Sequence, residues 1–158
     1  SRHYRLPAVA IAGGFAMEDH VFKGLALGAP YVRMVGIGRA AMAAALSGKK
    51  VGELIEAGTV PKEYQRFGNT KEEIFGDLPL LRKIYGDRAD EISTGAVGLF
   101  SYINRISDGL RQLMALNRKF ALEYIDRADI IPMTDLAARI SGIDDPKKAA
   151  EKAIDMFV

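Results

Sequence analysis

Hydrophobic positions near the start of the chain form first a short continuous run, as in a buried strand, and then recur at the spacing of a helix. Val9–Ala12 is a short apolar run that ends at two glycines, as a buried parallel strand does. Apolar residues recur at helical spacing over 17–27, and Gly28 follows where a helix C-terminus favours a left-handed residue. Residues 31–35 form a second apolar run that also ends in glycines. The pattern predicts a strand, helix, strand and helix, with a glycine turn after each strand.

The rest of the chain has the period of helices. Gly48 is interpreted as the end of the first of them, because glycine is a poor helix former and a common residue just past a helix end. Helices are expected, in chain order, over residues 39–46, 51–57, 62–67, 70–75, 80–85, 93–116, 135–140 and 145–156, with a short element of unspecified type over 120–125. The sequence Thr70-Lys71-Glu72-Glu73 has the form of a capping box.

The two glycine turns are candidates for binding an anion. Two parallel strands joined by one helix are neighbours in a sheet, so both turns would lie at its C-terminal edge. Glycine lets backbone N–H groups approach an anion closely, and a helix that begins near Arg39 adds its positive end. The unit from Ala8 to Met42 therefore predicts a phosphate cradle. The alternative is that both are merely tight turns between strand and helix.

Residues 21–29, with Gly13-Gly14 before them and Gly38-Arg39 after them, resemble a known family. The likeness is to the last two βα units of FMN-dependent (β/α)8-barrel oxidoreductases, and above all to the FMN-binding domain of glutamate synthase. In such barrels phosphate lies between the loops after strands seven and eight. The resemblance implies that the flavin phosphate is surrounded by Gly13, Gly14, Gly36, Ile37, Gly38 and Arg39.

The resemblance also implies a fold class and a division of the chain. Residues 1–48 would be the last two strand–helix units of an α/β barrel, and residues 49–158 a helical C-terminal extension, so the chain itself is expected to be predominantly α. Residues 100–115 and 126–131 resemble segments that follow this barrel in the family. A barrel needs about 250 residues. We therefore expect the C-terminal part of a longer protein whose partner is the remainder of the barrel.

Composition excludes several other classes of function. The chain has 158 residues, is 49% hydrophobic and carries a formal net charge of +2 with mixed signs, which predicts no nucleic-acid surface. No apolar run approaches the roughly 18 residues that a membrane span needs. The absence of cysteine is consistent with a cytoplasmic protein, and it rules out a cysteine-ligated iron–sulfur cluster in this chain.

No catalytic residue emerges from the sequence. His20 stands beside Glu18 and Asp19, but adjacent helical residues diverge, so we expect no metal site there. The two acids instead complement the dipole of the helix that they begin. By the resemblance, the flavin carries the redox chemistry of the full-length enzyme, and the fragment alone would be inactive.

Two other functions stay open. One is a non-flavin phosphate-binding barrel of the inosine-monophosphate dehydrogenase kind, which also has a Gly-Gly turn and a similar helix end. The other is a helical assembly module in which residues 99–113 pack against a partner. The fragment is also expected to form a homo-oligomer, because two strands of a barrel leave edges unpaired and an apolar face uncovered.

Overall fold

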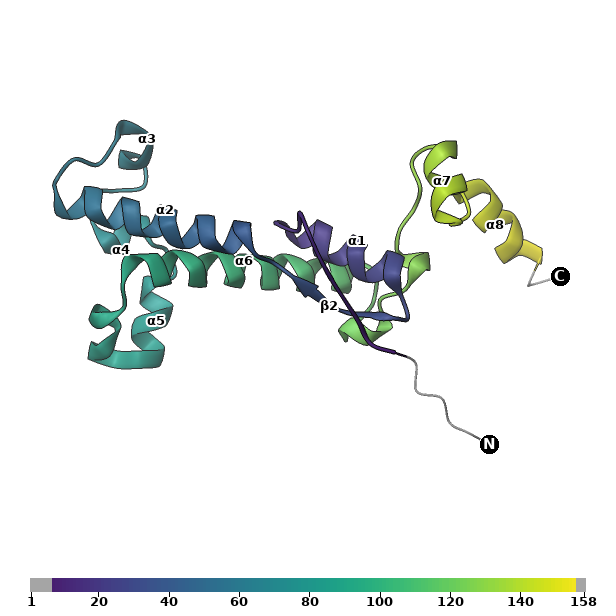
Figure 1. Ribbon diagram of the computed structural model, residues 1–158, viewed down its shortest axis with the longest axis horizontal. Helices are drawn as coiled ribbons and strands as arrows, with labels where there is room; N and C mark the ends of the chain where they lie inside the picture. Colours follow the sequence, from purple (N-terminus) through teal and green to yellow (C-terminus); the bar gives the residue numbers. More distant parts are fainter. Residues whose placement is uncertain (1–6, 156–158) are drawn as a thin grey trace. The chain divides into compact units, whose positions relative to one another are not determined.

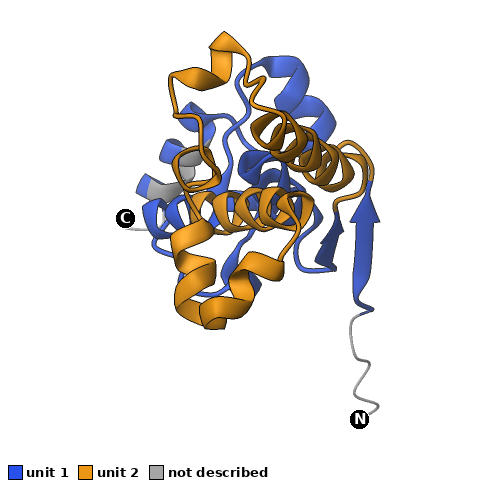
Figure 2. Cartoon of the chain, turned by 90° about the vertical axis from the view of Figure 1, so that its left-hand side faces the viewer, with its two compact units in different colours: residues 1–12, 17–36, 110–158 blue, residues 13–16, 37–109 orange. Residues whose placement is uncertain are grey.

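The computed structural model describes residues 7–155, in which helices predominate and the sheet has two strands (Figure 1). The chain divides into two compact and interleaved units (Figure 2). Unit 1 comprises residues 1–12, 17–36 and 110–158, and unit 2 comprises residues 13–16 and 37–109. The predominantly helical character is as expected, whereas the division of the chain at residue 48 stays a prediction. The expected end of the last helix at residue 156 lies outside the described residues.

Unit 1 contains the predicted strand–helix–strand element. Strands β1 (Val9–Ala12) and β2 (Val32–Gly36) pair in parallel, with Ala12 opposite Gly36. Helix α1 (Glu18–Gly28) connects them and buries Val21, Phe22, Leu25 and Ala26 on one face. That face packs against β2 and the 3₁₀ helix η3 (Arg127–Asp129). The two strands and their parallel order are therefore confirmed.

Gly28 serves a different purpose from the one expected. It is the last residue of α1 and does not adopt the left-handed conformation. A Cβ atom at this position would instead collide with the side chain of Val32. Glycine is required here because the chain folds back closely onto the next strand.

The C-terminal part of unit 1 consists of short elements after the long helix α6 (Thr94–Leu116), which enters this unit at Leu110. The short element expected over 120–125 contains one 3₁₀ turn. Thr134 caps the next helix, as its position suggests, by accepting a hydrogen bond from the Ala137 N–H at 3.1 Å. In chain order the elements are η2 (Leu122–Tyr124), η3, α7 (Asp135–Ser141) and α8 (Pro146–Asp155).

The secondary-structure elements described in unit 2 are all helices. It contains α2 (Arg39–Glu56), α3 (Lys62–Gln65), α4 (Lys71–Ile74), α5 (Leu78–Tyr85), the 3₁₀ helix η1 (Gly86–Glu91) and α6 as far as Gly109. Two expectations are wrong. Gly48 lies inside one continuous helix, α2, and α5 begins at Leu78 with Pro79 in its first turn. Proline fits that turn because its missing N–H would have no intrahelical partner there.

Close packing against α6 explains why α2 continues through Gly48. A Cβ atom on Gly48 would lie 2.5 Å from the carbonyl oxygen of Thr94 and 3.0 Å from the Cα atom of Gly98. Gly52 likewise lies directly against the Thr94 side chain. The core beside this crossing consists of Val51, Phe75, Leu78, Leu81 and Val97. Tertiary packing therefore outweighs the low helix propensity of glycine.

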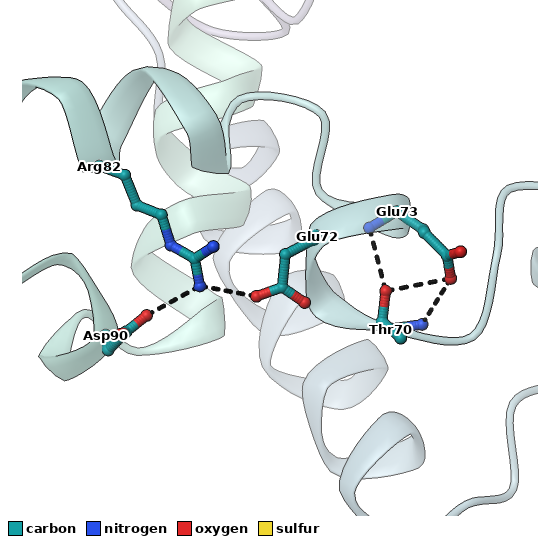
Figure 3. A network of polar contacts seen from close by, with 5 residues as sticks. All are labelled: Thr70, Glu72, Glu73, Arg82 and Asp90. Atoms are coloured by element: carbon teal, nitrogen blue, oxygen red, sulfur yellow. Dashed lines mark hydrogen bonds and ion pairs between the residues drawn. The ribbon is translucent and has the colours of Figure 1, made fainter. Parts of the chain in front are cut away.

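Polar contacts hold the short elements of unit 2 together (Figure 3). Thr70 and Glu73 form the predicted capping box at the start of α4. The guanidinium of Arg82 contacts the carboxylates of Glu72 at 2.7 Å and Asp90 at 3.0 Å. Arg82 thus links α5 to both α4 and η1.

Candidate functional site

The first glycine turn needs glycine because of its backbone. Gly13 and Gly14 follow β1 directly and have φ angles of 124° and 76°, which side chains rarely allow. A Cβ atom on either residue would meet nothing within 4 Å. The turn therefore leaves open space beside its backbone.

The glycines of the second turn differ from one another. A Cβ atom on Gly36 would lie 3.0 Å from that of Ala12, so the close pairing of the strands explains this glycine. Gly38 is the N-cap of α2, with a φ of −108° and no atom within 4 Å of an added Cβ. Glycine is a common N-cap residue, which accounts for Gly38, and the open space beside it leaves room for close approach of a ligand.

The sheet register brings the two turns to the same edge. Ala12 and Gly36 are partners at the ends of β1 and β2, and the turns follow them in the chain. Five of the six predicted site residues belong to unit 2, namely Gly13, Gly14, Ile37, Gly38 and Arg39, while Gly36 ends β2 in unit 1. Their role in ligand binding stays a prediction.

The helices that follow the turns differ in charge. The first turn of α1 carries Glu18 and Asp19, and among the described residues Glu18 Oε2 is buried without a hydrogen-bond partner. The first turn of α2 contains no acid, and no side chain caps it. An anion is therefore favoured at the start of α2 and disfavoured beside α1.

Arg39 begins α2 and is exposed to solvent. Within residues 7–155 no carboxylate pairs with its guanidinium. A cation at a helix N-terminus opposes the macrodipole, so Arg39 has no stabilising role within the helix itself. An anion bound at this helix end would offset that cost.

Tyr102 is a residue of this region that sequence reasoning missed. It lies on the part of α6 that belongs to unit 2, and its O–H donates a hydrogen bond of 2.9 Å to the carbonyl oxygen of Ala16. Burial raises the pKa of Tyr102 above its ordinary value of 10.0. No local pattern signals this contact, because the two residues are 86 positions apart.

The polar residues beside His20 interact within helix α1. Asp19 accepts a hydrogen bond from Lys23 at 2.7 Å, and this bond is the main reason that the pKa of Asp19 lies below its ordinary value. The nearest approach of His20 to Asp19 is 3.9 Å. In the part of the chain that the structure describes, no three His, Cys, Asp or Glu residues are grouped so as to hold a metal ion.

Glycine turns, helix N-termini and arginine side chains are each groups that bind anions, and residues 13–14 and 37–39 supply all three. None of the described helices has the length and apolar character needed to cross a membrane. Comparisons with profiles of protein families, with curated proteins and with solved structures find no match for this chain.

Proposed function

We propose that the chain supplies the flavin-phosphate site of a glutamate synthase-like FMN-dependent oxidoreductase, of which it forms the C-terminal part. This enzyme would act in amino-group metabolism in the cytoplasm. The observation that carries the proposal is the pair of glycine turns that leave adjacent parallel strands at one edge. Gly13, Gly14 and Gly38 have open space where side chains would otherwise block a phosphate.

Each part of the site has a separate task in this proposal. Backbone N–H groups of the two turns and of the first turn of α2 donate hydrogen bonds to phosphate oxygens. Arg39 adds a charge-assisted contact. The bound flavin supplies the hydride and electron chemistry, and this chain holds and orients it.

The exposure of the sheet supports a larger barrel around it. Parallel sheets are normally covered on both faces. Here β1 and β2 are largely exposed, and Met34 in β2 retains 56% of its accessible surface. The neighbours proposed for these strands are the remaining strands of the same barrel. Because barrel enzymes draw catalytic residues from several strand ends, the chain alone would be inactive.

Arg39 provides the first test of the proposal. In the full-length protein, Arg39→Ala should weaken FMN binding about ten- to a hundredfold, since a charge-assisted hydrogen bond is lost. Riboflavin lacks the phosphate, so its affinity should hardly change. Titration of both flavins into wild type and variant measures the difference. Equal losses for the two flavins, or undiminished FMN binding, would contradict the role of Arg39.

Gly14 and Gly58 form a matched pair for a second test. Both are left-handed, with φ angles of 76° and 66°, and both have nothing within 4 Å of an added Cβ. Gly14→Ala and Gly58→Ala should therefore suffer a similar backbone strain of about 1–2 kcal/mol. Only Gly14→Ala should lower flavin occupancy, measured by absorbance of the purified protein. Equal flavin occupancy in the two variants would show that the first turn does not belong to the flavin site.

Titration with inorganic phosphate, added to those with the two flavins, separates the alternative barrel enzyme. A protein that binds inorganic phosphate at Arg39 but neither flavin would favour a non-flavin phosphate-binding barrel.

A further inference from the structure

We propose that Tyr102 is a positioning residue, which holds the turn of residues 13–16 in the geometry that binds phosphate. This inference rests on the proposed function, and it assigns a part of the site to α6, far outside the strand–helix unit. Its basis is the hydrogen bond of 2.9 Å from the Tyr102 hydroxyl to the carbonyl oxygen of Ala16.

The turn needs an external restraint because its own residues provide little. Glycine is the residue type with the greatest backbone freedom, so fixing Gly13 and Gly14 costs conformational entropy. Neither glycine contacts surrounding atoms through a side chain. The carbonyl of Ala16, at the end of the turn, is the acceptor by which α6 holds it.

Helix α6 is a rigid support for this bond because it crosses α2 closely. Gly52 of α2 faces Thr94, Gly48 faces both Thr94 and Gly98, and Ala44 faces Gly98. Pairs such as these, in which α2 numbers fall as α6 numbers rise, describe antiparallel helices, which lie side by side in Figure 1.

The antiparallel order places Tyr102 near the other half of the site. Gly98 and Ala44 face each other. Tyr102 lies one helical turn after Gly98 on α6, and α2 begins about one turn before Ala44. Tyr102, in the middle of α6, is thus at about the same level of the helix pair as the N-terminus of α2. The bond to Ala16 therefore sets the position of the first turn relative to Gly38 and Arg39, all within unit 2.

The test replaces Tyr102 by Phe, which removes the donor and keeps the ring. In the full-length protein, Tyr102→Phe should raise the Kd for FMN about three- to tenfold, since one hydrogen bond that preorganises the site is lost. Riboflavin affinity should stay unchanged. Tyr64→Phe is the matched control, because Tyr64 is an exposed tyrosine of unit 2 whose hydroxyl makes no hydrogen bond among the described residues.

A second readout follows the turn without any ligand. Phe15 lies in the middle of the turn, so chymotryptic cleavage after Phe15 reports how often the segment opens. Cleavage should be faster in Tyr102→Phe than in wild type or Tyr64→Phe.

The outcomes distinguish this inference from the proposed function. If wild type binds FMN and Tyr102→Phe binds it equally well, the positioning role is overturned, whatever the cleavage rate. An equal loss of FMN and riboflavin would overturn the specific role toward phosphate. If wild type binds neither flavin nor inorganic phosphate, the proposed function fails and the ligand role of Tyr102 fails with it. Cleavage after Phe15 then decides alone whether Tyr102 restrains the turn.

Discussion

At the scale of single residues, the glycines of this chain have different structural roles, and the space around each one shows which role it has. Gly48 faces the backbone of α6 at distances that no side chain fits, whereas Gly38 faces open space. In the sequence the two look alike, because each stands beside an alanine-rich run. The local tendency of glycine to end a helix suggested a break at Gly48, and only the non-local crossing with α6 explains why there is none.

Alanine substitutions at these two positions should affect stability for different physical reasons. Gly48→Ala gains up to about 1 kcal/mol in helix propensity, but it places a Cβ against backbone atoms, which costs about 1–3 kcal/mol. We expect a net loss in the free energy of unfolding. Gly38→Ala should cost about 0.5 kcal/mol, because alanine is a poorer N-cap residue than glycine. Urea denaturation measures both, and a Gly48→Ala variant as stable as wild type would argue against the close crossing.

At the scale of elements, the features that local chemistry determines are the ones that the sequence predicts. The capping box at Thr70 and the N-cap at Thr134 each involve residues three positions apart. Both strands end at glycines, which are visible in the sequence. The start of α5 at Leu78 was missed because proline normally signals an interruption. The hydrogen bond from Tyr102 to Ala16 was missed because the two residues are far apart in the chain and no local sequence pattern relates them.

The capping box of α4 should make its helix sensitive to acid. Hydrogen bonds from the Asn69 N–H, the Thr70 hydroxyl and the Thr70 N–H hold the pKa of Glu73 below its ordinary value of 4.5. A carboxylate with a lowered pKa stabilises the folded helix above pH 4.5, and this contribution is lost as the pH falls through the lower value in the folded state. The amide resonances of Asn69 and Thr70 should shift across this acidic range.

Two substitutions check this assignment. Glu73→Gln should abolish the acid-dependent shift of the Thr70 amide. Glu63→Gln, at a position in α3 that accepts no hydrogen bond among the described residues, should leave it intact. A shift that persists without Glu73 would assign the titration to another group.

At the scale of the whole molecule, several large apolar side chains of the described residues are exposed to solvent. Phe120 is 84% exposed and Met133 is 88% exposed, and both belong to unit 1. Met42 and Leu46 lie one turn apart on α2 and are also exposed. These surfaces support the expectation that the isolated chain associates with itself.

Light scattering of the isolated chain should therefore give a mass above the 17.2 kDa of one copy. It should also bind a hydrophobic dye. Replacing Phe120 and Met133 together by Ser should lower both the mass and the dye signal, since the exposed apolar area falls. A monomer that binds no dye in its wild-type form would show that these side chains are covered in solution.

The interleaving of the two units has a consequence for biosynthesis. The apolar face of α1 packs against β2 and against η3, but η3 is encoded only after the whole of unit 2. At roughly 5–20 residues per second, a ribosome would leave that face incompletely covered for several seconds after α1 emerges. Unit 2 can form its own core during this interval, whereas unit 1 is complete only after residues 110–158 have been synthesised. The nascent polypeptide thus offers a binding window for chaperones that closes only once η3 has been synthesised.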